Sequence, residues 1–237
     1  MVNVTGIAEN IENVKRRIEK SAEKAGNDPT VIRIVAVTKT HPTEKVLEAV
    51  AAGIIDIGEN KLQEALKKFA SIYAEEPEFS AVKHFIGHLQ TNKVKKAVEL
   101  FDIIESIDSV KVAEAVSLEA GKLAKSMDIL VQVNTSGEES KFGIKPENTI
   151  DMIKKIADLP NLNIRGLMTI GIFSEDLHKV RSCFTLLKSL SNEIAELNIP
   201  GVKMDYLSMG MTGDFEIAVE EGANLVRLGT AIFGPRN

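Results

Sequence analysis

Short segments typical of β-strands alternate with longer segments typical of helices along the chain, and this alternation limits the possible folds more than any other feature. The strand segments are rich in Val and Ile, and the helical segments carry apolar residues at three- and four-residue steps. We expect strands at residues 31–38, 54–58, 84–86, 102–106, 128–134, 163–170, 203–208 and 225–228. The helices expected between them cover residues 43–52, 61–74, 91–99, 109–126, 147–158, 175–197 and 213–221. Eight such units without internal hairpins favour a parallel sheet.

The chain length favours closure of this sheet into a barrel rather than an open, doubly wound sheet. The chain has 237 residues, and a (β/α)8 barrel commonly needs about 250 residues for one core. No Gly/Ser linker, low-complexity tract or change in composition divides the sequence. We therefore predict an α/β fold, a single-domain (β/α)8 TIM barrel over residues 1–237. An extra helix is expected before it, because apolar residues from Val4 to Ala25 repeat at helical spacing until Gly26 and Pro29.

Composition argues against several classes of partner. The net charge of −5 and the absence of a basic block argue against nucleic acid. No run of about 18 apolar residues and no signal peptide is found, so we expect a cytoplasmic protein that does not interact with membranes. Cys183 is the only cysteine, which excludes an internal disulfide and a multi-cysteine metal site.

Lys39 stands at the end of the first expected strand, residues 31–38, which His41 and Pro42 close. A buried strand would place this amine in a pocket at the end of the barrel. Burial disfavours the charged form of lysine, and the neutral amine condenses with an aldehyde to form a Schiff base. The alternative is a lysine whose stem follows the strand end while its amine reaches water. Lys39 considered alone favours that alternative.

Two loops near the end of the chain offer donors for a phosphate group. Residues 208–212 follow the seventh expected strand, and residues 227–230 end the eighth. Hydroxyl groups, glycines and free helix N–H groups suit a phosphate dianion. Barrels often bind phosphate between these two loops, which favours such a site. The alternative is a pair of ordinary turns in which Thr212 and Thr230 cap helices.

A phosphate site near a strand-end lysine leaves two ligand classes open, those of a sugar-phosphate aldolase and of a pyridoxal phosphate protein. Arg227 favours the second class if it donates to a pyridine nitrogen, although a salt bridge is its alternative role. Asn60 is a candidate to bind a ring hydroxyl or to cap a helix, and Glu59 is a neighbouring acid or ion-pair partner. His84 and His88 are four residues apart and lack a third ligand, so we expect no metal site.

Seven segments, in order along the chain, resemble the pyridoxal phosphate homeostasis proteins, a family related to the barrel domain of alanine racemase. The segments are AVTKTHP (36–42), IGENKLQEAL (57–66), HFIGHLQTNK (84–93), VNTSGEESKFGI (133–144), RGLMTIG (165–171), LSMGMTGDFEIAVEEGA (207–223) and VRLGTAIFG (226–234). The resemblance implies that pyridoxal 5'-phosphate (PLP) is held as a Schiff base on Lys39. It implies that the phosphate is held by Ser208, Gly210, Met211, Thr212, Gly229 and Thr230.

The same resemblance implies roles for further residues around the ring. Arg227 would face the pyridine nitrogen, Asn60 would lie near the ring, and His88 and Met168 would form walls of the pocket. The chain departs from the family pattern at Lys61, where tyrosine or another basic residue is common, and at Phe142, where a small or polar residue is common. Both departures fall at the rim and leave the cofactor motifs unchanged.

The resemblance also implies a role in cofactor supply and amino-acid balance without catalytic turnover. We therefore expect a monomeric PLP carrier that is not an enzyme and whose possible partners are apo forms of PLP-dependent enzymes. Eight units use up the chain, so we expect no second domain to supply an opposing acid–base. Tyr73 and Tyr206, the only tyrosines, fall in a helix and within the seventh strand, away from Lys39. A small PLP-dependent amino-acid racemase is the alternative.

Overall fold

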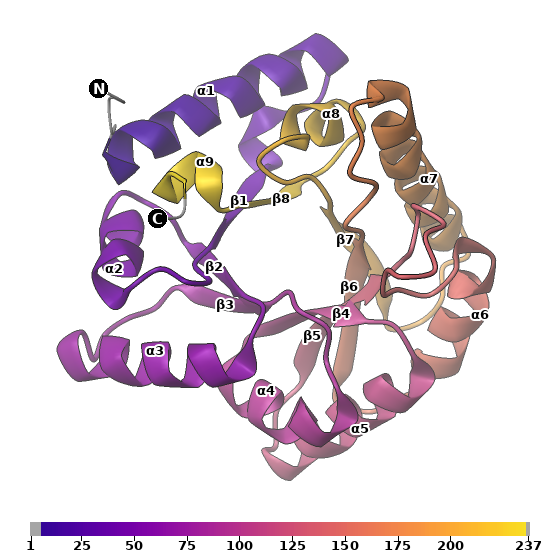
Figure 1. Cartoon of the computed structure of the whole chain (residues 1–237). Coiled ribbons are helices and arrows are strands. Elements are labelled where there is room, and N and C mark those ends of the chain that lie inside the picture. The colour runs from indigo at the N-terminus through magenta and orange to yellow at the C-terminus, as the bar shows by residue number, and fades with distance from the viewer. Residues whose placement is uncertain (1–5, 236–237) are drawn as a thin grey trace.

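A computed structural model describes residues 6–235 and shows a closed barrel of parallel strands. Within that range eight strands pair in sequence order, and the last pairs with the first. They are β1 (Arg33–Val37), β2 (Asp56–Glu59), β3 (Val82–Phe85), β4 (Ile103–Ile107), β5 (Met127–Gln132), β6 (Leu162–Met168), β7 (Val202–Ser208) and β8 (Leu225–Leu228). The helices surround the barrel as an outer ring (Figure 1). The predicted (β/α)8 fold class is confirmed.

The helices follow the expected order with changes at their ends. They are α1 (Ile7–Ala25), α2 (Thr43–Ala51), α3 (Leu62–Glu75), α4 (Val94–Leu100), α5 (Val110–Lys122), α6 (Pro146–Ile156), α7 (Leu177–Glu196), α8 (Phe215–Glu220) and α9 (Thr230–Phe233). Within residues 6–235, no helix is both long enough and apolar enough to cross a membrane.

Local chemistry explains several differences from the predicted boundaries. The extra N-terminal helix is confirmed as α1, although Val4 lies outside the described residues. The segment Pro29–Val31 forms a 3-10 turn, η1, in which the backbone N–H of Thr30 donates to the Asp28 side chain, so the first strand begins later than expected. The expected helix 109–126 ends at Lys122, because Ala124 adopts a left-handed conformation with φ of 51°. A second 3-10 turn, η2 (Thr91–Lys93), precedes α4.

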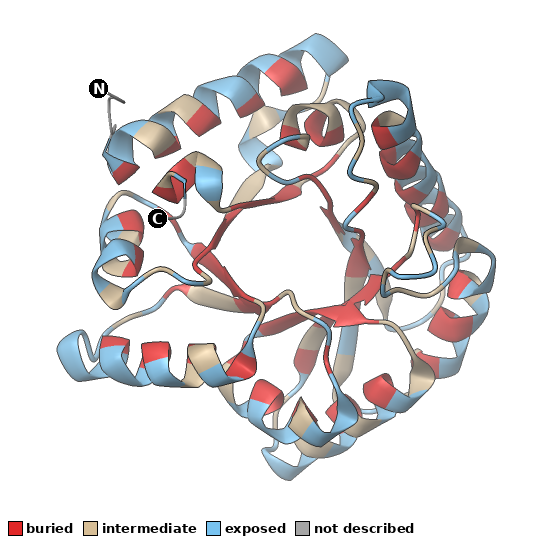
Figure 2. Cartoon of the chain, in the orientation of Figure 1, coloured by how far each residue is buried: buried red, intermediate tan, exposed pale blue. Residues whose placement is uncertain are grey.

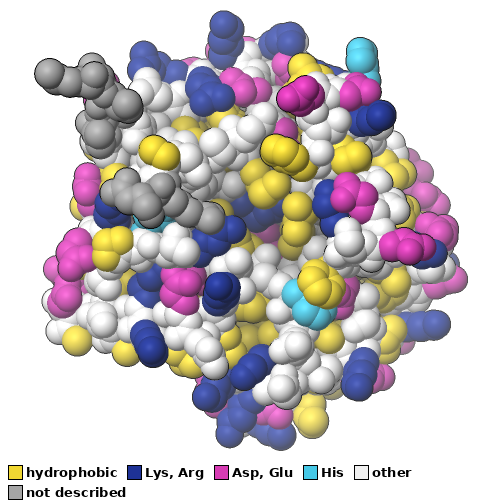
Figure 3. Space-filling model, in the orientation of Figure 1, with side chains coloured by type: hydrophobic (Ala, Val, Ile, Leu, Met, Phe, Trp, Pro, Cys, Tyr) yellow, Lys and Arg dark blue, Asp and Glu magenta, His cyan; other side chains and the backbone are white. Residues whose placement is uncertain are grey.

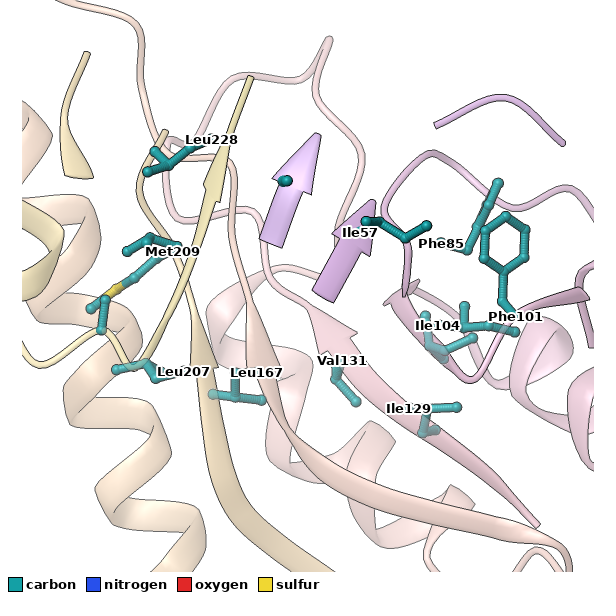
Figure 4. Close-up of a cluster of buried hydrophobic side chains, with 14 of the residues drawn as sticks. Ile57, Phe85, Phe101, Ile104, Ile129, Val131, Leu167, Leu207, Met209 and Leu228 are labelled. Carbon is teal, nitrogen blue, oxygen red and sulfur yellow. The ribbon is translucent and has the colours of Figure 1, made fainter. Parts of the chain in front are cut away.

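The main hydrophobic core lies between the strands and the ring of helices. Each long helix buries one stripe, as Figure 2 shows, and in α1 this stripe includes Ile11, Val14 and Ile18. Alternate strand residues meet these stripes, among them Ile57, Phe85, Ile104, Ile129, Val131, Leu167, Leu207 and Leu228 (Figure 4). Burial of one such side chain stabilises a fold by roughly 1.5–3 kcal/mol, so this layer supplies most of the apolar stabilisation.

The remaining strand residues point into the barrel, and many of them are polar. Glu105 of β4 and Ser208 of β7 share a hydrogen bond although their strands are not neighbours, so their side chains meet through the barrel interior. Apolar residues fill another part of the interior, where Val35, Leu130, Met168 and Leu225 form a separate cluster with Tyr206. The inside of this barrel is therefore divided between charged and apolar side chains.

Candidate functional site

A pocket of about 290 Å³ lies among the loops that follow β1, β6, β7 and β8. Figure 3 shows a hollow over the centre of the barrel, bordered by basic and hydrophobic side chains. The pocket is lined by Val37, Lys39, His41, Ile172, Phe173, Ser174, Leu177, Val180, Met211, Thr212, Gly213, Asp214, Arg227, Gly229 and Thr230. Small-molecule pockets commonly measure about 300–1,000 Å³, so this one suits a small ligand.

The pocket brings together several of the residues predicted from the sequence. These are Lys39, Met211, Thr212, Arg227, Gly229 and Thr230. They come from both ends of the chain, and the pairing of β1 with β8 makes them neighbours. The predicted residues Asn60, His88, Met168, Ser208 and Gly210 do not line the pocket itself.

Gly210 acts through the backbone just before the pocket loop. Its φ is 91°, a conformation that side chains rarely adopt. A Cβ atom at this position would lie 2.6 Å from Cβ of Ala218 and 2.9 Å from Cα of Phe215. Glycine therefore lets the loop after β7 pass directly against α8 and carry Met211 and Thr212 into the pocket.

Lys39 lies two residues beyond the end of β1 and is half-buried. The turn that carries it is held by α3. Lys68 of α3 donates a hydrogen bond to the carbonyl oxygen of Thr38 at 2.6 Å. Glu64, one helical turn earlier, accepts a hydrogen bond from the backbone N–H of Thr40, which has a φ of 65°. Contacts on both sides of Lys39 therefore fix the backbone of this turn.

Glu59 completes the support of this turn, in the ion-pair role that the sequence suggested. Its Oε1 atom lies 2.5 Å from Nζ of Lys68, and both side chains are buried. Thr38 also donates from its hydroxyl to the same oxygen at 2.7 Å. Burial raises the pKa of Glu59, while its hydrogen bond with Lys68 acts in the opposite direction. A buried charge pair thus supports the turn that carries Lys39.

The loops after β7 and β8 are joined to each other and present hydrogen-bond donors. The backbone N–H of Ala231 donates to Oγ1 of Thr212 at 3.2 Å. Within residues 6–235, the N–H groups of Thr212, Gly213 and Thr230 have no acceptor in the protein. These N–H groups and two hydroxyls are the donors that a phosphate group requires. Asp214 also lines the pocket, and burial raises the pKa of its carboxyl.

Arg227 reaches the pocket from the barrel interior and is buried. Its Nη1 atom donates to Oγ of Ser208 at 2.5 Å, and Nη2 donates to the carbonyl oxygen of Thr169 at 2.6 Å. Burial lowers the pKa of Arg227, and the carboxylates of Glu105 and Asp214 oppose that shift. The hydroxyl of Ser208 is therefore engaged with Arg227 inside the barrel.

The other predicted residues lie around the pocket rather than in its wall. Met168 is buried in the apolar cluster of the barrel interior. His88 is exposed at the rim, where its ring stacks on that of Phe142 at 3.7 Å, and its Nδ1 atom lies 3.4 Å from a carboxylate oxygen of Asp108. Oδ1 of Asn60 is buried and has no hydrogen-bond partner among the described residues. Such an oxygen lacks the donor that a buried polar group normally has.

The sequence reasoning missed three charged residues of the barrel interior and the apolar side of the pocket. Asp56, Glu105 and Arg33 lie on the strands and connect with His84 and Arg227. The sequence did carry a signal for these residues, because each is a charged residue within a strand segment expected to be buried. A buried charge needs a partner, which indicates an ion pair inside the barrel. The loop after β6 gave no comparable signal, although its Ile172 and Phe173 line the pocket.

Comparison with known proteins gives a consistent result over nearly the whole chain. Residues 2–237 match the family model described as alanine racemase, N-terminal domain. A pyridoxal phosphate homeostasis protein from Vibrio cholerae is 40% identical, over 98% of this chain and 97% of its own length. One from Homo sapiens is 42% identical, over 98% of this chain and 87% of its own. PipY from Synechococcus elongatus, whose structure has been solved with PLP bound, is 33% identical in sequence. The two structures superpose with a TM-score of 0.83, and the match covers 96% of this chain and 100% of PipY.

Proposed function

The chain belongs to the pyridoxal phosphate homeostasis proteins, within the family of the alanine racemase N-terminal domain, and from that membership we propose that it binds PLP in the pocket and holds it on Lys39. PLP supplies an aldehyde that condenses with a primary amine and a ring that acts as an electron sink. A structure of the relative PipY contains PLP, which supports this choice of ligand.

The observation that carries the proposal is the chemistry of the pocket lining. One cavity presents a lysine amine, the hydroxyls of Thr212 and Thr230, unpaired N–H groups and a guanidinium, that of Arg227. These donors match a compound with an aldehyde, a phosphate and a ring nitrogen. Asn60 adds a buried oxygen that needs a donor. Lys39 would form the Schiff base, the loops after β7 and β8 would hold the phosphate, and Arg227 would face the ring nitrogen.

The proposed role is that of a carrier without catalytic turnover. Racemisation needs two proton-transfer groups on opposite faces of the substrate, and both tyrosines of the chain are engaged elsewhere. Tyr206 accepts a hydrogen bond from Arg33 in the barrel, and Tyr73 of α3 accepts one from Lys83. Arg227 at the ring nitrogen would also disfavour protonation of the ring and so weaken the electron sink. The racemase alternative would have to use His41 or Asp214, which line the pocket beside Lys39.

The open side of the pocket supports exchange of cofactor with other proteins. Thr230 is exposed, and Phe173 of the loop after β6 is fully exposed although it lines the cavity. An incoming amine could therefore reach the ligand. The proposal is a cytoplasmic, monomeric carrier that passes PLP to apo forms of PLP-dependent enzymes. The net charge of −5 is consistent with a carrier that binds neither nucleic acid nor anionic membranes.

Borohydride reduction tests the attachment site. Protein incubated with PLP is reduced, digested and mapped by mass spectrometry, and we expect the adduct on Lys39. Lys39→Ala should lose both the adduct and the visible absorption of the bound cofactor. An adduct found mainly on Lys61, Lys93 or Lys141 would contradict the assignment. Folded protein that binds no PLP at all would contradict the proposed function and return Lys39 to the aldolase or structural alternatives.

A further inference from the structure

A hydrogen-bonded series of charged side chains crosses the inside of the barrel. It begins with Arg33 at the start of β1, which donates to Asp56 of β2 from Nε at 2.9 Å and from Nη2 at 2.5 Å. His84 of β3 follows, and its Nε2 atom lies 2.9 Å from the same carboxylate. Asp56 and His84 are fully buried, and Arg33 is partly exposed. The charge series therefore starts at the end of the barrel remote from the pocket.

The series continues from His84 toward the pocket. Nδ1 of His84 lies 2.7 Å from Oε1 of Glu105, and Ser208 donates to Oε2 of Glu105 at 2.5 Å. Arg227 in turn donates to Ser208 at 2.5 Å, and its guanidinium lies 3.9 Å from the Glu105 carboxylate. Positive and negative groups thus alternate from Arg33 to Arg227. Since Arg227 is the last member, the pocket receives the positive end of the series.

Hydrogen-bond chemistry fixes the direction of every link near the pocket. A carboxylate only accepts and a guanidinium only donates, whereas a hydroxyl does both. Because Glu105 is held as a carboxylate, Ser208 must point its hydrogen at Glu105 and its lone pairs at Arg227. His84 supports that state: burial opposes its charge, yet its bonds to Asp56 and Glu105 raise the pKa of His84 to about 9. Burial likewise favours protonation of Glu105, but His84 lowers the pKa of that carboxyl below its usual value.

We propose that Glu105 and His84 are positioning residues that act through Ser208 to hold the guanidinium of Arg227 in one orientation at the pocket. The carbonyl oxygen of Thr169 provides the second anchor, so Arg227 is fixed at both Nη atoms. The consequence for cofactor binding rests on the proposed function, because Arg227 is assigned there to the ring nitrogen. A guanidinium already held in place loses less conformational entropy when a ligand binds.

The side chain of Arg227 can be observed directly in protein without PLP. Its Nη–H signal in a nitrogen-15 NMR spectrum is assigned by its loss in Arg227→Lys. In the native protein we expect a narrow signal whose hydrogen exchanges slowly. Ser208→Ala should broaden it and speed exchange by about tenfold, which corresponds to one lost hydrogen bond to a charged group. Glu105→Gln should also broaden the signal, because the charge that orients Ser208 is gone.

Ser106→Ala is the matched control. Ser106 is buried in β4 beside Glu105, but its hydroxyl has no partner among the described residues, so its removal should leave the Arg227 signal unchanged. PLP affinity, measured by fluorescence titration, should fall about two- to tenfold in Ser208→Ala, the factor expected when one more side chain must be immobilised on binding. It should equal the native value in Ser106→Ala. If Glu105→Gln fails to fold, Ser208→Ala carries the test.

The outcomes separate this proposal from the proposed function. An Arg227 signal that is the same in native protein, Ser208→Ala and Glu105→Gln overturns the positioning role. Weaker PLP binding in Ser208→Ala with an unchanged Arg227 signal also overturns it, because Ser208 would then contact the ligand directly. A signal that responds as expected, in a native protein that binds no PLP, supports the positioning role and contradicts the proposed function alone.

Discussion

Replacing Lys68 by methionine is expected to destabilise the fold by about 3 kcal/mol at pH 7.5. Nζ of Lys68 bonds to Glu59 at 2.5 Å and to the carbonyl oxygen of Thr38 at 2.6 Å, and both charged side chains are buried. Removing one partner of a buried ion pair commonly costs about 3–5 kcal/mol, because the other charge stays buried without compensation. We expect the lower end of this range because burial already raises the pKa of Glu59, so its carboxyl can take up a proton.

The cost should depend on pH in a defined direction. Without Lys68 the pKa of Glu59 rises further above its value in the unfolded chain. A carboxyl with a raised pKa in the folded state binds its proton more tightly there, so it stabilises the fold at low pH and loses that contribution as pH rises through the folded pKa. The loss caused by Lys68→Met should therefore be smaller at pH 5 than at pH 7.5.

Urea unfolding followed by circular dichroism measures both quantities. Lys67→Met is the matched control, since Lys67 is the exposed neighbour on α3 and its substitution should change stability by no more than about 0.5 kcal/mol. The double variant Lys68→Met/Glu59→Gln should recover part of the loss, because no charge is left buried. If Lys68→Met and Lys67→Met lose equal amounts of stability, the reasoning is refuted. A loss of stability in Lys68→Met that does not change with pH would also refute it.

Three further expectations concern the pocket and the charge series. Thr212→Val and Thr230→Val should each weaken PLP binding about tenfold or more, since a donor to a charged acceptor contributes roughly 1.5–3 kcal/mol; equal affinities in a fluorescence titration would reject the phosphate role. Native protein should show no substantial racemase, transaminase or decarboxylase turnover, and chiral analysis that finds interconversion lost in Lys39→Ala would establish a racemase instead. His84, with its pKa raised from 6.5 to about 9, should contribute about 3 kcal/mol of stability that is fully present below about pH 6.5 and lost as pH rises through about 9. An NMR titration of its ring checks this, and a midpoint below pH 7 would be inconsistent with it.

The barrel was predictable because its signals are local. Runs of Val and Ile mark strands, helical spacing marks the covering helices, and the order of parallel units determines which strands are neighbours. The closeness of Lys39 to Arg227, Gly229 and Thr230 follows from the same topology, since β8 pairs with β1. The short α9 was not predicted, because four residues are too few to show a periodic pattern.

The polar contacts inside the barrel were not predictable to the same degree. Alternation along a strand tells which side chains point inward, but the partner of each depends on distances across the barrel. Ser208 shows the difference. The sequence suggested that Ser208 binds a phosphate group, and the structure places its hydroxyl between Glu105 and Arg227. Lys68 was also missed, although it falls on the apolar stripe of α3 with Ala65 and Ile72, where an amine needs a partner.

The joining of the first and last strands has a consequence for synthesis of the protein. Lys39 is translated early and Thr230 near the end, yet both line the same cavity. In addition, α9 packs on α1 through a hydrogen bond from Asn10 to the carbonyl oxygen of Ile232. Translation delivers the N-terminal part first. A nascent chain that lacks β8 thus lacks Arg227, Gly229 and Thr230 of the pocket and has no closed barrel. Ligand binding by a growing chain would consequently show when β8 has paired with β1 and closed the barrel. A ligand that binds only the closed barrel would stabilise complete chains relative to partial ones.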